Sequence, residues 1–493
     1  MRSIGPRAFR MPWSPDGPRP DETRRGKMKG SRTFRVAWLF LLSLLLAGPL
    51  LPSGQAHAAT PACMAEQNWI SSPAPPSEIP EGSNADFCDF YQFAWQWFFQ
   101  LVSPSQSDPS LRNFQVNSNY PVLQATGTNS CDPAKQAEVM FVRREKSPAA
   151  DTPFTLPDRT GQAGGGDTIF DQAGNVVFYE IRFSQSLCNV PQIQSALNFP
   201  AGTTELKTAW RIITQAEQPS YFWIEADVDG VPGTELLGLV GFHMAIATAL
   251  HPEFIWATFE HRSNVPECSN PGTAPPSGWS FTSATCAVDN PPSTCNINKA
   301  APSPNLTGTP SEICRVYHDG TDPSDHEAAD NIADIDSLNS QLQGFLTALP
   351  GDSPMAVWQN YMNVGALWEN DVTQPSSTFS NQRGSMRLAN SVMETTFQYV
   401  DPTQSFISNC FGCHNFNGSG KSNTIPWASL SHIFDDVMKG QCSSPSDVQA
   451  GPIFNNTQAA EVCPKVCNSQ GGWNGNWKTT EPGTMSVCGC CGG

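Results

Sequence analysis

The spacing of apolar and polar residues predicts a domain built from both helices and strands. Aromatic residues crowd the span 87–102, which indicates a buried helix, and β-branched or aromatic runs between turn residues indicate strands. Helices are predicted at 87–102, 204–214, 327–349 and 382–400. Strands are predicted at 174–183, at 253–264 and in two parts of 220–248. This pattern predicts an α+β fold, with one large mixed domain over residues 86–440.

Proline and serine mark the segments between the predicted elements. Residues 71–86 (SSPAPPSEIPEGSNAD) are typical of a linker or surface arm, so residues 59–85 are assigned to it. Residues 265–312 are rich in proline, serine and cysteine, which predicts a long loop held by disulfides. Residues 441–493 are predicted to form a separate small α+β module.

The first 58 residues are typical of a secretory signal peptide. Basic residues precede the uncharged apolar run VAWLFLLSLLLAG (36–48), and the small residues Ala56 and Ala58 follow it. Met28 opens the more ordinary part of the signal and is an alternative start of the chain. The run is too short, and too interrupted by proline, for a stable membrane span. We therefore expect cleavage near Ala58, a soluble periplasmic or secreted protein, and no transmembrane anchor afterwards.

Cleavage of this signal would leave a strongly acidic protein. The whole chain has a formal charge of −17, and the first 58 residues hold ten Lys or Arg against three Asp or Glu. The mature chain would therefore keep 18 basic and 42 acidic residues, a charge of −24. Nucleic-acid binding requires basic patches, so no nucleic-acid partner is expected.

All sixteen cysteines follow residue 58, where export favours disulfides. Eight of them precede Cys410 and six follow Cys413, so each group can pair within itself. The connectivity cannot be deduced from the sequence.

Cys410 and Cys413 belong to the motif CFGCH, which has the spacing of a haem c attachment site. Both thiols would bond to the haem vinyl groups, and His414 would be the proximal iron ligand. A disulfide, zinc binding and thiol redox chemistry are the alternatives. Zinc would need another Cys or His at short spacing, and a thioredoxin-like site would need a βαβ setting. The motif therefore predicts one covalent haem c.

The sixth iron ligand is less constrained by the sequence. The candidates are Met393, Met438, His432 and His243. Met393 is preferred because it shares a face of the predicted helix 382–400 with Met386, and His243 is the weaker candidate carried forward. Core packing is the ordinary role of such residues.

Further segments between residues 86 and 435 share the sequence pattern of a known protein family. They include FAWQWFFQLV, FDQAGNVVFYEIRF, ELKTAWRII, ELLGLVGFHMAIAT, PEFIWATFEHRSN and LANSVMETTFQ. Together with CFGCH they resemble a family of bacterial exported mono-haem proteins, the cytochrome c family. The resemblance implies covalent haem and a location outside the cytoplasm, and it leaves the redox partner unknown.

The last residues predict one helix and two strands. NNTQAAEVCPKVC indicates the helix, and GGWNGNWKTT and GTMSVCGC indicate the strands. Trp473 and Trp477 stand among Asn and Thr residues, a combination that suits a sugar, since aromatic rings pack on pyranose C–H groups and amides bond hydroxyls. Packing in the module core is the alternative role of both tryptophans.

The segments AGPIFNNTQAAEVCPK, GGWNGNWKTT and MSV, within about 450–491, resemble the mannan-binding lectin family. The resemblance implies binding of mannose-containing glycans through one module. Phe454 and Asn476 stand where Trp and Gln are common in that family. The implied sugar-facing residues are Phe454, Asn455, Asn456, Trp473, Gly475, Asn476, Trp477 and Met485.

The cysteines of the tail are spaced to link its helix to a strand. Cys463 and Cys467 share a helix face, and Cys488 and Cys490 share a strand face. Two disulfides could therefore staple a module whose core is small. Cys442 and Cys491 are a third candidate pair. The alternative is a metal cluster of Cys488, Cys490 and Cys491.

The sequence thus predicts an exported c-type haem protein that transfers electrons and carries a glycan-binding module. One alternative is a haem-dependent oxidoreductase held near polysaccharide. Another is a lectin-like surface protein with a secondary redox centre. No acid–base pair of a hydrolase is recognisable, so an electron carrier or binding protein is favoured over an enzyme.

Overall fold

The structure is a computed structural model, and the described residues lie within the second of its two compact units, Thr60–Gly493. These residues are 63–80, 87–123, 131, 139–142, 168–189, 199–228, 231–300, 303, 305–325, 328–372, 374, 379–395, 398, 409–414, 431, 433, 446–454, 456–467, 470 and 473–490. The predicted signal peptide, His432, Met438, Cys442, Asn455 and Cys491 lie outside them. Within these ranges, no helix combines the length and the apolar character needed to cross a membrane.

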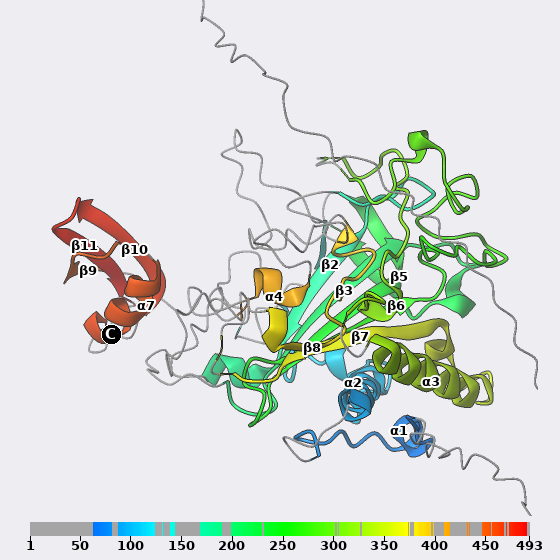
Figure 1. Cartoon of the computed structure of the whole chain (residues 1–493), viewed down its shortest axis with the longest axis horizontal. Helices are drawn as coiled ribbons and strands as arrows, with labels where there is room; N and C mark the ends of the chain where they lie inside the picture. Colours follow the sequence, from blue (N-terminus) through cyan, green and yellow to red (C-terminus); the bar gives the residue numbers. More distant parts are fainter. Residues whose placement is uncertain are drawn as a thin grey trace, which may run out of the picture. The chain divides into compact units, whose positions relative to one another are not determined.

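An eight-stranded sheet forms the centre of the large domain (Figure 1), in the order β3-β2-β1-β4-β5-β6-β7-β8. All neighbouring strands pair antiparallel except β1 and β4. The long strand β5 pairs with β4 through its first half and with both β3 and β6 through its second half. The strands are β1 (Val139–Val142), β2 (Phe178–Phe183), β3 (Thr204–Ile212), β4 (Trp223–Val228), β5 (Val231–Ile246), β6 (Ile255–His261), β7 (Tyr361–Glu369) and β8 (Gln382–Gly384).

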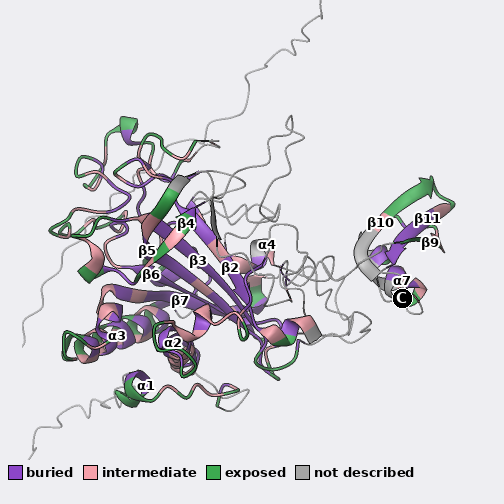
Figure 2. Cartoon of the chain, turned by 180° about the vertical axis from the view of Figure 1, so that it is seen from behind, coloured by how far each residue is buried: buried purple, intermediate pink, exposed green. Residues whose placement is uncertain are grey.

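Two long helices pack beside this sheet (Figure 1), and a short α1 precedes them in the chain. They are α2 (Phe87–Val102) and α3 (Ala328–Thr347), and α1 spans Asn68–Ser71. The aromatic rings of α2 enter the core, where Phe98 stacks on Phe259 of β6 with ring centroids 4.0 Å apart. Each such fully buried ring contributes about 1.5–3 kcal/mol. The sheet is buried along most of its strands (Figure 2).

Short 3-10 helices connect these elements. They are η2 (Asn113–Gln115), η4 (Gln185–Asn189), η5 (Gln218–Ser220), η6 (Ser293–Cys295), η7 (His318–Gly320), η8 (Ala356–Asn360) and η9 (Phe379–Asn381).

Most elements of the large domain follow the apolar pattern, and the fold is α+β as expected. The predicted helices at 87–102 and 327–349 are confirmed as α2 and α3, and the predicted strands are confirmed as β2, β4, β5 and β6. The helix predicted at 204–214 is wrong, because these residues form β3. Apolar residues of β3 lie on both faces of the sheet, because Ala209 shares the face of the charged residues. Leu206, Ala209 and Trp210 therefore imitate helical spacing.

The helix predicted at 382–400 is also wrong in the described part of that span. Its first residues form β8, and turns follow through residue 395. Polar side chains there bond to the sheet rather than to solvent, since Asn390 Nδ2 donates to Thr258 Oγ1 at 2.9 Å and Ser391 Oγ donates to Glu260. These tertiary bonds replace the bonds of a helix.

The segment expected to be a linker or arm lies against the large domain over residues 63–80. A disulfide joins Cys63 to Cys88 at the start of α2. Trp97 Nε1 of α2 donates to the Pro76 carbonyl at 3.0 Å. The Glu78 carboxylate accepts from Thr248 Oγ1 at 2.7 Å and from the Leu250 amide at 2.9 Å. This part of the arm is therefore fixed to the domain.

The eight cysteines before the CFGCH motif pair among themselves, as their even number indicated. Two of the bridges close the proline-rich span 265–312, which is the disulfide-held loop predicted from its composition. The four bridges are Cys63–Cys88, Cys131–Cys188, Cys268–Cys314 and Cys286–Cys295. With two more in the tail, these bridges are compatible with a secreted protein.

The tail has its own three-stranded antiparallel sheet, in the order β10-β11-β9, and one helix, α7. Disulfides Cys463–Cys488 and Cys467–Cys490 join α7 to β11, which is the helix-to-strand staple expected from the spacing. A disulfide that closes a loop of this length stabilises the folded state by about 3 kcal/mol. The elements are β9 (Ser446–Gly451), α7 (Asn456–Val466), β10 (Trp473–Glu481) and β11 (Met485–Cys490).

Gly365 in β7 packs too closely against its surroundings to accept a side chain. Its φ is +146°, and a Cβ would lie 2.1 Å from Ser385 Oγ and 3.0 Å from the Asp319 carbonyl oxygen. We expect Gly365→Ala to lower the free energy of unfolding by roughly 2–5 kcal/mol, from strain and overpacking together. Denaturant unfolding with disulfides intact measures it. Gly344→Ala is the control, since a Cβ at this α3 position meets nothing within 4 Å. Equal stability of both variants would contradict the packing described.

Candidate functional site

The CFGCH motif forms a single helical turn, α4 (Cys410–Cys413). The Asn409 side chain caps this turn by accepting from the Phe411 amide at 3.0 Å, and Asn409 Nδ2 donates to Gln382 Oε1 and to the Met386 carbonyl. The His414 amide donates to the Cys410 carbonyl at 2.8 Å. Backbone bonding thus places the two cysteines and the histidine on one turn, although the Cys413 side chain lies outside the description.

This turn is anchored to the sheet by its second residue. Phe411 is fully buried in an apolar cluster with Trp256 of β6, and the half-buried Cys410 packs against the same cluster. The ring of Trp256 also contacts the half-buried His414 ring, with centroids 4.5 Å apart. The fixed turn therefore presents Cys410 and His414 beside the sheet face that carries Trp256.

The donor set fits a covalent haem c. Cys410 and Cys413 would hold the vinyl carbons, and His414 would ligate the iron, because these three groups occur within five residues on one turn. A bound haem would supply reversible one-electron transfer at this turn.

A buried carboxyl group lies in the same cross-strand row as Trp256. In the register of the sheet, Glu205 of β3 lies opposite Ala245 of β5, which lies opposite Trp256. The Ser431 hydroxyl donates to Glu205 Oε1. Burial raises the pKa of Glu205 to about 8, only partly opposed by this hydrogen bond. Glu205 therefore holds its proton over a pH range in which an exposed glutamate is ionised.

This raised pKa makes stability depend on pH. Between about pH 4.5 and pH 8 the unfolded chain releases the Glu205 proton while the folded chain keeps it, so the free energy of unfolding should fall as pH rises. Glu205→Gln removes the ionisation, and we expect it to be more stable than the natural chain at pH 8 by roughly 2–4 kcal/mol. Denaturant unfolding at pH 5 and pH 8 measures the difference. Glu225→Gln, at an exposed position of β4, is the control; a Glu205→Gln profile parallel to the natural one would refute the expectation.

The next row of the same sheet face carries a histidine that is hydrogen-bonded to a carboxylate. Lys207 of β3 lies opposite His243 of β5, and His243 Nε2 lies 2.9 Å from each carboxylate oxygen of Glu394. Burial raises the pKa of Glu394, but His243, Lys207 and the Asn390 amide outweigh it and hold the pKa below its ordinary value. His243 is thus a hydrogen-bonded residue of a charged cluster.

Met393 packs against β5 farther from the row that contains Trp256 than His243 lies. The fully buried Met393 packs at Gly241, where its Cε would be 2.8 Å from an added Cβ. Gly241 is four residues from Ala245, on the order of 13 Å, and His243 is two residues away, on the order of 7 Å. By strand register, His243 therefore lies nearer than Met393 to the row of Trp256, and both residues stay predictions for the sixth ligand.

The sugar-facing residues implied for the tail differ in exposure. Phe454 is 65 % exposed, and its amide donates to Gln458 Oε1 at 2.9 Å. The preceding Ile453 amide donates to Ser486 Oγ at 3.2 Å, which places Phe454 near the half-buried Met485. Phe454 therefore offers an open aromatic ring beside β11.

Trp477 has a mixed role. It lies opposite Cys488 in the register and packs against the apolar core of the module, so the core-packing alternative holds for part of its ring. The register between β10 and β11 shifts between Trp473 and Trp477, within the stretch that contains Gly475 and Asn476. Asn456 begins α7. The irregular part of β10 therefore contains Gly475 and Asn476, which are two of the implied sugar-facing residues.

Four residues on or beside the sheet face that carries His243 were not predicted as site residues from the sequence. They are Glu205, Lys207, Glu394 and Ser431. A signal for the first two was present, since charged residues alternate in TELKTAWRI with the period of a strand. Glu394 and Ser431 reach the cluster only through tertiary contacts.

The comparisons with known proteins bear on the tail alone. Residues 456–490 match the family model MVL, described as mannan-binding protein. No curated protein and no solved structure matches the chain. The matched residues comprise α7, β10 and β11, which are joined by the two disulfides of the tail. The similarity to the mannan-binding protein family is therefore confined to residues 456–490.

Proposed function

We propose that the C-terminal module binds mannose-containing glycans and that this is the function best supported for the chain. The observation that carries the proposal is the family match over residues 456–490. The exposed ring of Phe454 adds to it, because an aromatic side chain left open to solvent beside a sheet is suited to packing on a sugar ring.

The proposed module has one copy in this chain, so a single site would bind with modest affinity unless several chains cluster. A glycan array probed with the full disulfide-bonded chain tests the proposal. We expect signal on mannose oligosaccharides that exceeds the signal on galactose oligosaccharides. Absence of any mannose-dependent signal, including with chains clustered on beads, would overturn it.

We further propose that the large domain is a c-type haem domain and that the chain is an exported electron carrier, periplasmic or secreted, tethered to glycan by its tail. The supporting observation is the anchored turn of Cys410, Cys413 and His414 against Trp256. Its redox partner is unassigned. A pyridine haemochrome assay on protein made in a host with haem-attachment machinery tests for covalent haem.

A haem-dependent oxidoreductase is the second candidate for the large domain. The observation that favours it is the cluster of buried Glu205 with half-buried His243 and Glu394, because such groups can hold or deliver protons beside a redox centre. The reduced absorption spectrum separates the two candidates. A six-coordinate low-spin spectrum supports an electron carrier, and a five-coordinate high-spin spectrum supports an oxidoreductase.

A further inference from the structure

Three side chains of the large domain, apart from the residues discussed so far, converge on one point. His318 and Asp319 lie in η7, and Asp336 lies in α3. His318 Nε2 is 3.2 Å from Asp319 Oδ2 and 3.2 Å from Asp336 Oδ1. One ligand atom from each residue lies within 4.8 Å of the other two. We propose that these three residues bind one divalent transition-metal ion of the zinc type.

The strongest indication is the environment of Asp319. Its side chain is 1 % exposed, and neither carboxylate oxygen accepts a hydrogen bond from any residue that the structure describes. A buried carboxylate without donors is costly, so such groups are normally paired or coordinate a metal. The 3.2 Å contact of Asp319 with His318 lacks the geometry of a hydrogen bond, and a cation between Asp319, His318 and Asp336 would bind this carboxylate directly.

The spacing of the donor atoms suits one small ion. Two ligands of a tetrahedral zinc ion, each bonded at about 2.0–2.1 Å, lie about 3.3 Å apart. The two spacings from His318 Nε2 are both 3.2 Å. The side chains of His318 and Asp336 are 43 % and 54 % exposed, so the remaining coordination position faces solvent. Three protein ligands and an open position are typical of a non-structural zinc site.

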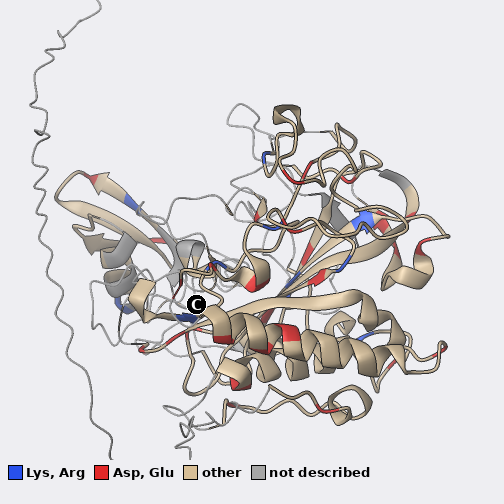
Figure 3. Cartoon of the chain, turned by 45° about the vertical axis from the view of Figure 1, so that its right-hand side comes forward, with Lys and Arg blue, Asp and Glu red and all other residues tan. Residues whose placement is uncertain are grey.

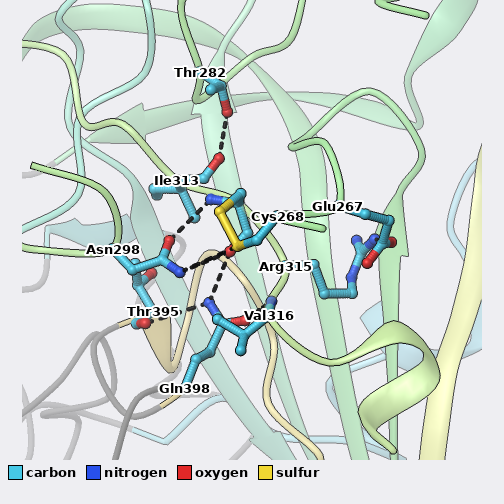
Figure 4. The surroundings of a disulfide bond; sticks show 10 residues. Glu267, Cys268, Thr282, Asn298, Ile313, Arg315, Val316, Thr395 and Gln398 are labelled. Atoms are coloured by element: carbon cyan, nitrogen blue, oxygen red, sulfur yellow. Dashed lines mark hydrogen bonds and ion pairs between the residues drawn. A yellow bond between two sulfur atoms is a disulfide. The ribbon is translucent and has the colours of Figure 1, made fainter. Parts of the chain in front are cut away.

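A further carboxylate is placed to orient the histidine. Glu267 Oε1 lies 3.6 Å from His318 Nδ1, the ring nitrogen that does not face the aspartates. Metal-bound histidines usually donate their other N–H to such a group, which fixes the ring. Glu267 is in turn paired with Arg315, and both residues adjoin the Cys268–Cys314 disulfide (Figure 4).

The ligand loop is held in place before any ion binds. The Thr321 hydroxyl donates to the Asp319 carbonyl at 3.1 Å. That carbonyl also lies close to Gly365 of β7, at the position where no side chain fits. Asp319 is therefore fixed against the sheet, while Asp336 is fixed by the helix.

Carboxylate groups outnumber guanidinium groups around the cluster. Arg262 and Arg315 are the guanidinium groups that interact with it. The carboxylates are Glu260, Glu267, Asp319 and Asp336. Helix α3 adds to the negative field, since it carries aspartates and no Lys or Arg (Figure 3).

An imidazole with two carboxylates favours zinc over calcium. Imidazole is a preferred ligand of zinc and its neighbours in the first transition row. Calcium takes six to eight oxygen ligands, whereas this cluster provides two carboxylates and a nitrogen.

Zinc titration of the full disulfide-bonded chain, cleared of metal with EDTA, tests the proposal. Competition with a chromophoric chelator measures affinity, and elemental analysis measures stoichiometry. We expect one tight equivalent in the natural chain that is lost or weakened at least tenfold in Asp336→Asn and in His318→Ala. Glu267→Gln should weaken it by about tenfold. Asp330→Asn, at an exposed position of the same helix, is the matched control and should bind as the natural chain does.

Zinc held by Cys410 and Cys413 or by the tail would persist in both ligand variants, and that result would overturn the proposal. Stronger binding of calcium than of zinc would overturn it as well. Folding is checked by melting in EDTA, where Asp336→Asn should melt as one transition and lose at most the small contribution of its exposed contact with His318. A zinc-dependent rise in melting temperature that the natural chain shows and Asp336→Asn lacks gives a second readout. The same rise in both would count against the site.

Discussion

Replacing Phe454 by alanine should weaken the binding of mannose oligosaccharides by about tenfold or more. The ring is 65 % exposed, so its removal leaves no cavity in the module, and the change in affinity reports lost contact with the sugar. Tenfold corresponds to about 1.4 kcal/mol, which is within the range of one aromatic contact. Titration calorimetry or biolayer measurement on the full chain gives the affinity.

Two further variants make this result specific. Phe454→Trp introduces the residue common at this position in the lectins that the tail resembles, and it should bind at least as well as the natural chain. Trp223→Ala removes another exposed aromatic, on β4, and should not alter the affinity. If Phe454→Ala binds mannose oligosaccharides like the natural chain, the sugar site lies elsewhere in the module.

Replacing both Cys410 and Cys413 by serine should abolish covalent haem. The proposed attachment uses these two thiols alone, so haem in the variant would be extractable by acidified acetone. The measurements are the pyridine haemochrome spectrum and intact mass, the natural chain being heavier by one haem. The matched control is Cys286→Ser with Cys295→Ser, which removes a disulfide pair from the loop 265–312 and should leave haem attachment intact.

The same experiment distinguishes the other chemistries open to the motif. A natural chain with no added haem mass, whose Cys410 and Cys413 resist alkylation until reduced, would indicate a disulfide and overturn the haem proposal. Retention of covalent haem by the double serine variant would place the attachment elsewhere. His414→Ala should keep the thioether bonds and change the spectrum, because it removes the proposed proximal ligand while leaving both thiols.

Local periodicity was sufficient to predict an element correctly where that element buries one continuous apolar stripe. The spans 87–102 and 327–349 are helices as predicted, and the staple between α7 and β11 follows from the spacing of its cysteines. The resemblance of the tail to the mannan-binding lectin family was also predicted from its local motifs, and the family match over 456–490 agrees with it. These features depend on residues within a few turns of one another.

Periodicity failed for β3, where the environment on both faces decides the structure. Leu206 and Trp210 face the aromatic core, while Lys207 and Glu205 are buried on the opposite face with charged or polar partners. A sequence pattern treats a charged residue as exposed, so it cannot recognise a strand whose polar side is buried.

The sequence by itself determined the main helices, most strands, the helix-to-strand staple of the tail and the residue types of the CFGCH motif. Tertiary structure alone decided that His243 rather than Met393 lies nearer to this motif, because strand register fixes which residues share a row. It alone brought His318 and Asp319 to Asp336 and Glu267. The physical reason is that backbone hydrogen bonding and apolar spacing act over a few residues, whereas register, burial and charge pairing join residues far apart in the chain.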